Sequence, residues 1–76
     1  VLLTNPVKDN LRISCRNFSS TTQYVLYSQS SQIIKQGRIE NPNGVNTIDC
    51  KDLKSGIYFF RIIDENQVLI KKIIVL

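Results

Sequence analysis

The sequence predicts an all-β domain: an immunoglobulin-like antiparallel β-sandwich of about seven short strands. Three observations support this expectation. Apolar and polar residues alternate with a period of two along most of the chain, which is typical of strands with one buried face. Gly, Pro, Asn, Asp and Ser recur between these runs, at spacings of roughly 8–12 residues. No segment carries apolar residues at helical spacing over three turns, so we expect essentially no helix.

The first predicted strands follow from this alternation. Val1–Leu3 is apolar and resembles a strand, and in Leu11–Cys15 every second residue is apolar. A polar connection, Phe18–Thr22, leads to the next strand at Tyr24–Tyr27. Ser28–Ser31 then turns the chain, because a cluster of small polar residues between periodic segments is typical of a loop.

The middle of the chain predicts two further strands. Gln32–Ile39 is interrupted by Gly37, which predicts a bulge there. Asn43 and Gly44 form a strong turn signal, since both residues tolerate a positive φ. Val45–Cys50 follows as another alternating strand.

The last third predicts a turn and a β-hairpin. Leu53–Gly56 is the turn, and we expect Gly56 to need a positive φ. Ile57–Ile63 and Gln67–Val75 pair across Asp64–Asn66. Both strands are apolar on both faces, whereas a two-layer sandwich buries only one face of each strand. One possibility is that an apolar stripe stays exposed, as is typical of interaction sites. The other is that loops or the N-terminal segment cover this stripe.

Length and composition set broad limits. A chain of 76 residues forms one domain of marginal stability, and 42% apolar content suffices for a small core. No apolar run reaches about 18 residues, so we expect no transmembrane insertion. The start of the chain lacks the pattern of an export signal peptide. We therefore expect residues 1–76 to be a single domain and a fragment of a longer secreted protein.

The net charge of +4 allows two interpretations. It could attract an acidic partner such as nucleic acid or lipopolysaccharide, or it could be ordinary solubilising charge. The basic residues are scattered, and no interleaved aromatic and basic pattern of a nucleic-acid-binding motif is visible. We expect no nucleic-acid partner.

The two cysteines, Cys15 and Cys50, fall on predicted core positions. Without a CxxC pair or any histidine, a zinc site is excluded. Two interpretations remain open. The cysteines are buried free thiols, which behave as small apolar residues, or they form a disulfide, which an extracellular location allows.

The sequence offers no catalytic constellation, so we expect no enzyme and no cofactor or metal. Histidine, the commonest general base, is absent. Asp49 lies on the polar phase of its strand and Asp52 in a turn, so both are interpreted as solvated carboxylates. The acidic residues lack the spacing of a calcium loop, and no glycine-rich phosphate loop occurs.

Four blocks of the sequence resemble one known family, the C-terminal sorting domain of the Bacteroidetes type IX secretion system. Near the start, Asn5-Pro6 stands where the family has an aromatic-Pro-Asn-Pro block. In the middle, Leu26-Tyr27 matches a Leu-Tyr-Asp-x-x-Gly-Lys motif, with Ser28 in place of its aspartate and Ser31 in place of its glycine.

The other two blocks lie in the last third of the chain. Leu53-x-x-Gly56-x-Tyr58 is a very close match, and Lys71-Lys72 with the apolar residues after it matches the end of the family's pattern. The four blocks occur in the family's order and cover nearly the whole chain. The resemblance places candidate translocon-recognition residues at Asn5, Pro6, Gly56, Tyr58, Lys71, Lys72, Ile73 and Ile74.

The resemblance implies that the domain routes an attached upstream cargo through the outer-membrane type IX translocon. The cargo would cross the periplasm and reach the cell surface or the medium, and a sortase-like peptidase would cut upstream of the domain. On the last strand we expect one face to lock into the sandwich, while the face with Lys71 meets the receptor.

Two other functions remain open from the residues alone. One is an accessory immunoglobulin-like module that binds carbohydrate or protein within a larger secreted enzyme, and the other is a structural spacer. A carbohydrate platform needs several exposed aromatics in a row. The candidates Phe18, Tyr27 and Phe59 lie on different segments, which disfavours such a platform.

Overall fold

The computed structural model describes residues 6–65 and 67–76. In these residues the chain forms six strands in two antiparallel sheets and no helix, which confirms the predicted fold class. Val1–Leu3, which we expected to be a strand, lies outside the described residues, as does Asn66 of the last predicted turn. The strands are β1 (Asn10–Ser14), β2 (Gln23–Ser28), β3 (Ile33–Arg38), β4 (Val45–Asp49), β5 (Gly56–Ile63) and β6 (Val68–Val75).

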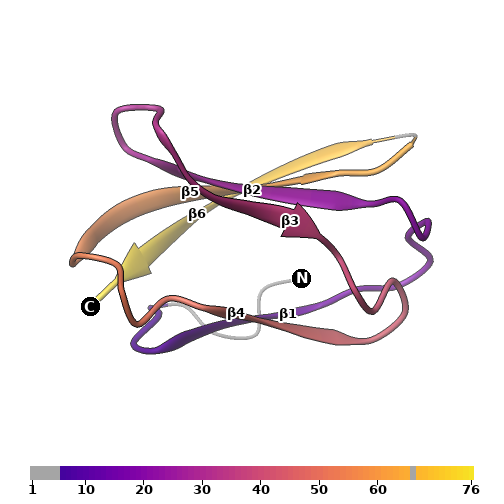
Figure 1. The fold of residues 1–76 in the computed structure, drawn as a ribbon, viewed down its shortest axis with the longest axis horizontal. Coiled ribbons are helices and arrows are strands. Elements are labelled where there is room, and N and C mark those ends of the chain that lie inside the picture. The colour runs from indigo at the N-terminus through magenta and orange to yellow at the C-terminus, as the bar shows by residue number, and fades with distance from the viewer. Residues whose placement is uncertain (1–5, 66) are drawn as a thin grey trace.

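The two sheets form two layers of unequal width (Figure 1). One layer is the pair β1-β4, and the other has the strand order β3-β2-β5-β6. Two of the pairings, β2-β3 and β5-β6, are local hairpins, whereas β1-β4 and β2-β5 join segments distant in the chain. The face of the larger sheet that is turned away from β1 and β4 is called here the outer face.

Alternation explains which side chains fill the space between the layers. Every second residue of β1, β4 and β5 is buried. Burial of apolar surface is the main force that holds such layers together, at roughly 25 cal/mol per Å². The buried cluster comprises Val7, Leu11, Ile13, Cys15, Leu26, Ile39, Ile48, Cys50, Tyr58, Phe60, Ile62, Ile73 and Val75.

The last hairpin forms as predicted, but the buried face of β6 differs from our expectation. Ile73 and Val75 are buried, and Ile74 is 43% exposed. We expected the face of β6 that carries Lys71 to point outward. Ile73 and Val75 share that face and are buried, so the expectation is wrong for these two residues. Because both faces of this strand are apolar, alternation alone could not decide which one the narrower layer covers. Lys72 and Ile74 belong to the outer face, where an apolar stripe remains exposed.

The bulge predicted at Gly37 is also misplaced. Gly37 pairs regularly with Tyr24, and the register shifts further along, where Leu26 faces Lys35 and Tyr27 faces Ile33. A Cβ at Gly37 would stand 3.0 Å from the Tyr24 ring. Glycine is needed here because an aromatic side chain lies across the neighbouring backbone, which is the other reason for glycine within a strand.

Among the described residues, positive φ angles occur at one predicted position and at two others. Gly56 has a φ of 154°, which confirms the prediction. The chain turns at Asn43 as expected, but neither Asn43 nor Gly44 has a positive φ. The reason is that this turn carries the chain from one sheet to the other and does not close a two-residue hairpin. Ser31, which stands where the family motif has glycine, has a φ of 68°.

Both cysteines are buried free thiols, which confirms the first of the two interpretations. The amide of Cys15 donates to the Gly44 carbonyl and that of Cys50 to the Asp9 carbonyl, so the two thiols lie at opposite ends of the β1-β4 pair. Strands rise about 3.3 Å per residue, so the five paired positions between them span about 17 Å, whereas a disulfide needs Cα atoms within about 7 Å.

Candidate functional site

The candidate residues from β5 and β6 lie side by side in the structure. Along the hairpin, Gly56 faces Val75, and Tyr58 faces Ile73. The lysines Lys71 and Lys72 follow on β6, opposite Phe60 and Phe59 respectively. Gly56, Tyr58 and Ile74 thus lie at the open end of the β5-β6 hairpin, and the two lysines lie midway along it.

The N-terminal block comes to the same place. The Val7 amide donates to the Ile74 carbonyl at 2.7 Å, and the Leu76 amide donates to the Val7 carbonyl at 2.8 Å. This parallel bridge ties the segment after Pro6 to the end of β6. Asn5 lies outside the described residues.

Burial separates these candidates into two groups. Ile73 is fully buried and Tyr58 is 8% exposed, so both serve the core of the folded domain. The accessible members are Pro6, Gly56, Lys71, Lys72 and Ile74.

Gly56 and Tyr58 form a corner that starts β5. The Tyr58 hydroxyl donates to the Lys54 carbonyl at 2.8 Å, which fixes the turn before the strand. Such a contact between a buried tyrosine and backbone just upstream is known from the corners of immunoglobulin-like sandwiches. Leu53 packs against the core from the same turn. The Leu53-x-x-Gly56-x-Tyr58 motif therefore has a structural explanation in this chain.

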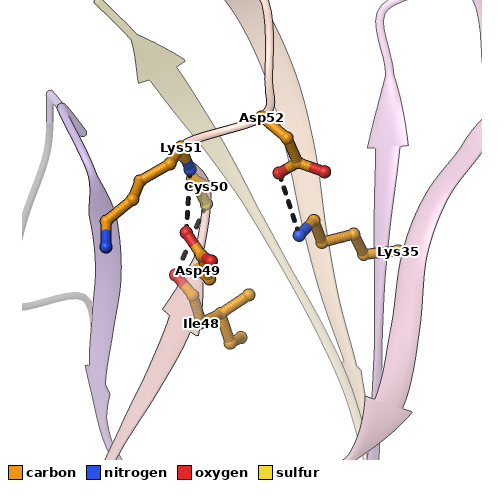
Figure 2. A network of polar contacts seen from close by, with 6 residues as sticks. All are labelled: Lys35, Ile48, Asp49, Cys50, Lys51 and Asp52. Carbon is orange, nitrogen blue, oxygen red and sulfur yellow. Dashed lines mark hydrogen bonds and ion pairs between the residues drawn. The ribbon is translucent and has the colours of Figure 1, made fainter.

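A polar cluster links the two layers near this corner (Figure 2). The Lys35 ammonium group, on β3, lies 3.0 Å from a carboxylate oxygen of Asp52, in the turn after β4. The hydrogen bond from Lys35 lowers the pKa of Asp52. Asp49 accepts a hydrogen bond from the Lys51 amide at 2.9 Å. Both carboxylates are exposed as expected, and the cluster serves as a surface tie between sheets.

Asp64 has a structural role that sequence reasoning missed, because a turn aspartate looks solvated. The buried Thr22 hydroxyl donates to its carboxylate at 2.6 Å, and the Ser19 amide donates at 3.1 Å. These hydrogen bonds lower the pKa of Asp64. The β5-β6 turn is thereby attached to the loop before β2.

The outer face carries a hollow of about 240 Å³ that sequence reasoning also missed. Tyr27 and Phe59, which seemed to lie on separate segments, are direct cross-strand partners here, and both are half-buried. The sequence gives no signal for this pairing, because β2 and β5 are far apart in the chain. The lining residues are Tyr27, Ser28, Ser31, Phe59, Arg61 and Ile70.

No group of three or more His, Cys, Asp or Glu side chains in residues 6–65 and 67–76 is arranged to hold a metal ion. Within the same residues, no helix is both long and apolar enough to cross a membrane.

Comparison with known proteins agrees with the sequence resemblance. None of the curated proteins matches the chain. A family model described as "Secretion system C-terminal sorting domain" matches residues 4–76, which is nearly the whole chain. This family acts in type IX secretion, whose sorting signal implies export to the cell surface or the extracellular space. The chain therefore belongs to the family of secretion system C-terminal sorting domains.

Proposed function

We propose that this domain carries an attached upstream protein to the type IX outer-membrane translocon and is read there in its folded form. The cargo crosses the periplasm, passes the translocon and is separated from the domain by a sortase-like peptidase. The domain itself has no catalytic role and forms one unit of a longer secreted protein.

The observation that carries this proposal is that the accessible candidate residues lie close together along the second half of β6 and on the two segments bound beside its end. In a member of a sorting family, neighbouring exposed residues of this kind are the natural place for a receptor contact. Lys72 supplies positive charge and Ile74 exposed apolar surface on the outer face, and Lys71 supplies charge from the opposite face of β6. Pro6 lies beside them through the bridge at Val7. We name these residues as the recognition surface, together with Asn5 and Gly56.

The test is export of a reporter fused ahead of residues 1–76 in a bacterium with a working type IX system. The double variant Lys71→Ala and Lys72→Ala is expected to fold and to export less reporter. Its stability should change by about 0–1 kcal/mol, because exposed charges contribute little. A translocon-deficient strain gives the background.

Lys51→Ala with Lys54→Ala is the matched control, since it removes the same charge from exposed positions in the turn after β4. We expect this control to export normally. If both double variants lose the same amount of export, Lys71 and Lys72 act only through the net charge of the domain and not as a specific contact. Secretion that is independent of the translocon would reject the proposed function as a whole.

A further inference from the structure

The hollow on the outer face is built from three strands and one turn. Phe59 and Arg61 come from β5, Tyr27 from β2 and Ile70 from β6, and Ser28 and Ser31 close one end. Its lining is mostly apolar, and Ile70, at one wall, is 61% exposed. Exposed apolar surface around a hollow on a small soluble domain is typical of an interaction site.

Arg61 is the polar group of this hollow, and its hydrogen bonding is incomplete. One terminal nitrogen donates to the Tyr27 hydroxyl at the long distance of 3.4 Å. The Nε atom is buried and has no acceptor among the described residues. A buried donor without a partner is costly, and it is costlier for a charged group. A guanidinium group matches a carboxylate best, because its planar fork donates two parallel hydrogen bonds.

The surrounding sheet contains no carboxylate that could meet this need. The four described strands β2, β3, β5 and β6 contain no Asp or Glu, although they carry five cations. The six acidic residues of the chain lie just before β1, in β4 or in the segments between strands. Lys72, opposite Phe59, adds positive charge beside the hollow. The surface at the hollow, with Arg61 and Lys72, is thus complementary in charge to an acidic partner. The five cations are Lys35, which is paired with Asp52, and Arg38, Arg61, Lys71 and Lys72.

We infer that the hollow binds an extended, acidic segment of a translocon protein, with one apolar side chain in the hollow and a carboxylate on Arg61. The two side chains would stand two residues apart, because such positions face the same side of an extended chain. This inference rests on the proposed function for the identity of the partner. The chemistry of the segment follows from Arg61, the apolar walls and the absence of acidic residues in the sheet.

The first experiment uses the purified domain and a defined probe. The blocked peptide acetyl-Thr-Leu-Thr-Glu-Thr-amide is titrated into isotope-labelled protein, and the Arg61 Nε–H signal and the Ile70 amide signal are followed by NMR. Both signals should shift saturably. The peptide with Gln in place of Glu should bind about ten-fold more weakly, because charge-assisted hydrogen bonds are roughly twice as strong as neutral ones.

Matched variants distinguish the hollow from general charge and general apolarity. Arg61→Gln and Ile70→Thr should each weaken peptide binding, and the β-branched threonine preserves strand preference. Arg38→Gln and Val45→Thr, which change residues outside the hollow, should bind as the unchanged domain does. Equal binding of the Glu and Gln peptides would overturn the inference, and so would equal loss in the Arg38 variant. A response to anionic phospholipid vesicles with none to the peptide would overturn it as well.

The same four variants in the export assay separate this inference from the proposed function. If the unchanged domain is exported and the Arg61 and Ile70 variants are exported equally well, the hollow is not the contact and the function stands. If the unchanged domain is not exported, the function fails, and the peptide titration still decides what the hollow binds.

Discussion

Gly56→Ala is expected to lower the free energy of unfolding by about 1–2 kcal/mol. Gly56 has a φ of 154°, a backbone conformation that L-residues rarely adopt. Such a position costs about 1–3 kcal/mol for a residue with a side chain. Part of this cost is offset, because alanine restricts the unfolded chain by about 0.4–1 kcal/mol relative to glycine.

Collision with the rest of the fold contributes nothing to this expected loss. A Cβ built at Gly56 meets no atom within 4 Å beyond its own chain neighbours, so the local backbone conformation carries the effect. Gly56→Val should therefore also lower stability. For a domain of this size the total stability is roughly 4–11 kcal/mol, and each kcal/mol lost lowers the melting temperature by about 4–8 °C.

The assay is thermal and urea unfolding followed by circular dichroism, with a chemically synthesised chain that has D-alanine at position 56 as the control. The D-residue favours positive φ and should be as stable as glycine or more so. Equal destabilisation by L- and D-alanine would refute the reasoning, and so would an unchanged midpoint for both. Ser31→Gly should act in the opposite direction and gain about 0.5–1 kcal/mol, because Ser31 has a φ of 68°.

Two further predictions concern titrating groups. Because the pKa of Asp64 is lowered in the fold, its contribution to stability is present above the ordinary aspartate pKa and is lost as pH falls through the folded value. In urea titrations, the Asp64→Asn variant should be less stable than the unchanged domain at pH 7, and this difference in unfolding free energy should shrink below about pH 4. A difference that does not change with pH would contradict a contribution from the ionised Asp64 carboxylate. Burial raises the pKa of the Cys15 and Cys50 thiols, so both should react slowly with dithiobisnitrobenzoate in the folded domain. In denaturant without reductant, both should react rapidly. Fast reaction of the folded domain would contradict their burial.

The local features of this fold could be predicted because they depend on neighbouring residues. Alternation identified the strand at Leu11–Cys15, and glycine chemistry identified the strained position at Gly56. The sheet partners could not be predicted, because nothing in the period of β2 says that it pairs with β5. The buried face of β6 was misjudged for a related reason: Ile73 and Ile74 are equally apolar. Only the register against β5, which sets Ile73 beside the buried Tyr58, decides which one is covered.

The candidate site was partly predictable in the same sense. The hairpin between β5 and β6 follows from sequence, so its residues were expected to be neighbours. The contact from Val7 to Ile74 and the Thr22–Asp64 hydrogen bond depend on the closed tertiary fold, and they carry no local signal. In the sequence, Arg61 is a single charged residue within the apolar segment Ile57–Ile63. Its incomplete hydrogen bonding becomes visible only when Tyr27 and Ile70 are placed beside it.

The distant strand pairings have a consequence for the order of events during synthesis. While β5 and β6 are still missing, β2 and β3 form a two-stranded ribbon, which is marginal in water at best. β1 likewise cannot pair until β4 has been synthesised, and the bridge from Val7 cannot form until Val75 has been synthesised. A growing chain therefore gains little from partial folding, and closure of long loops makes the final step slow. Until Val75 has emerged, the apolar segments stay open to chaperones, so the completed fold reports that the whole domain has been made.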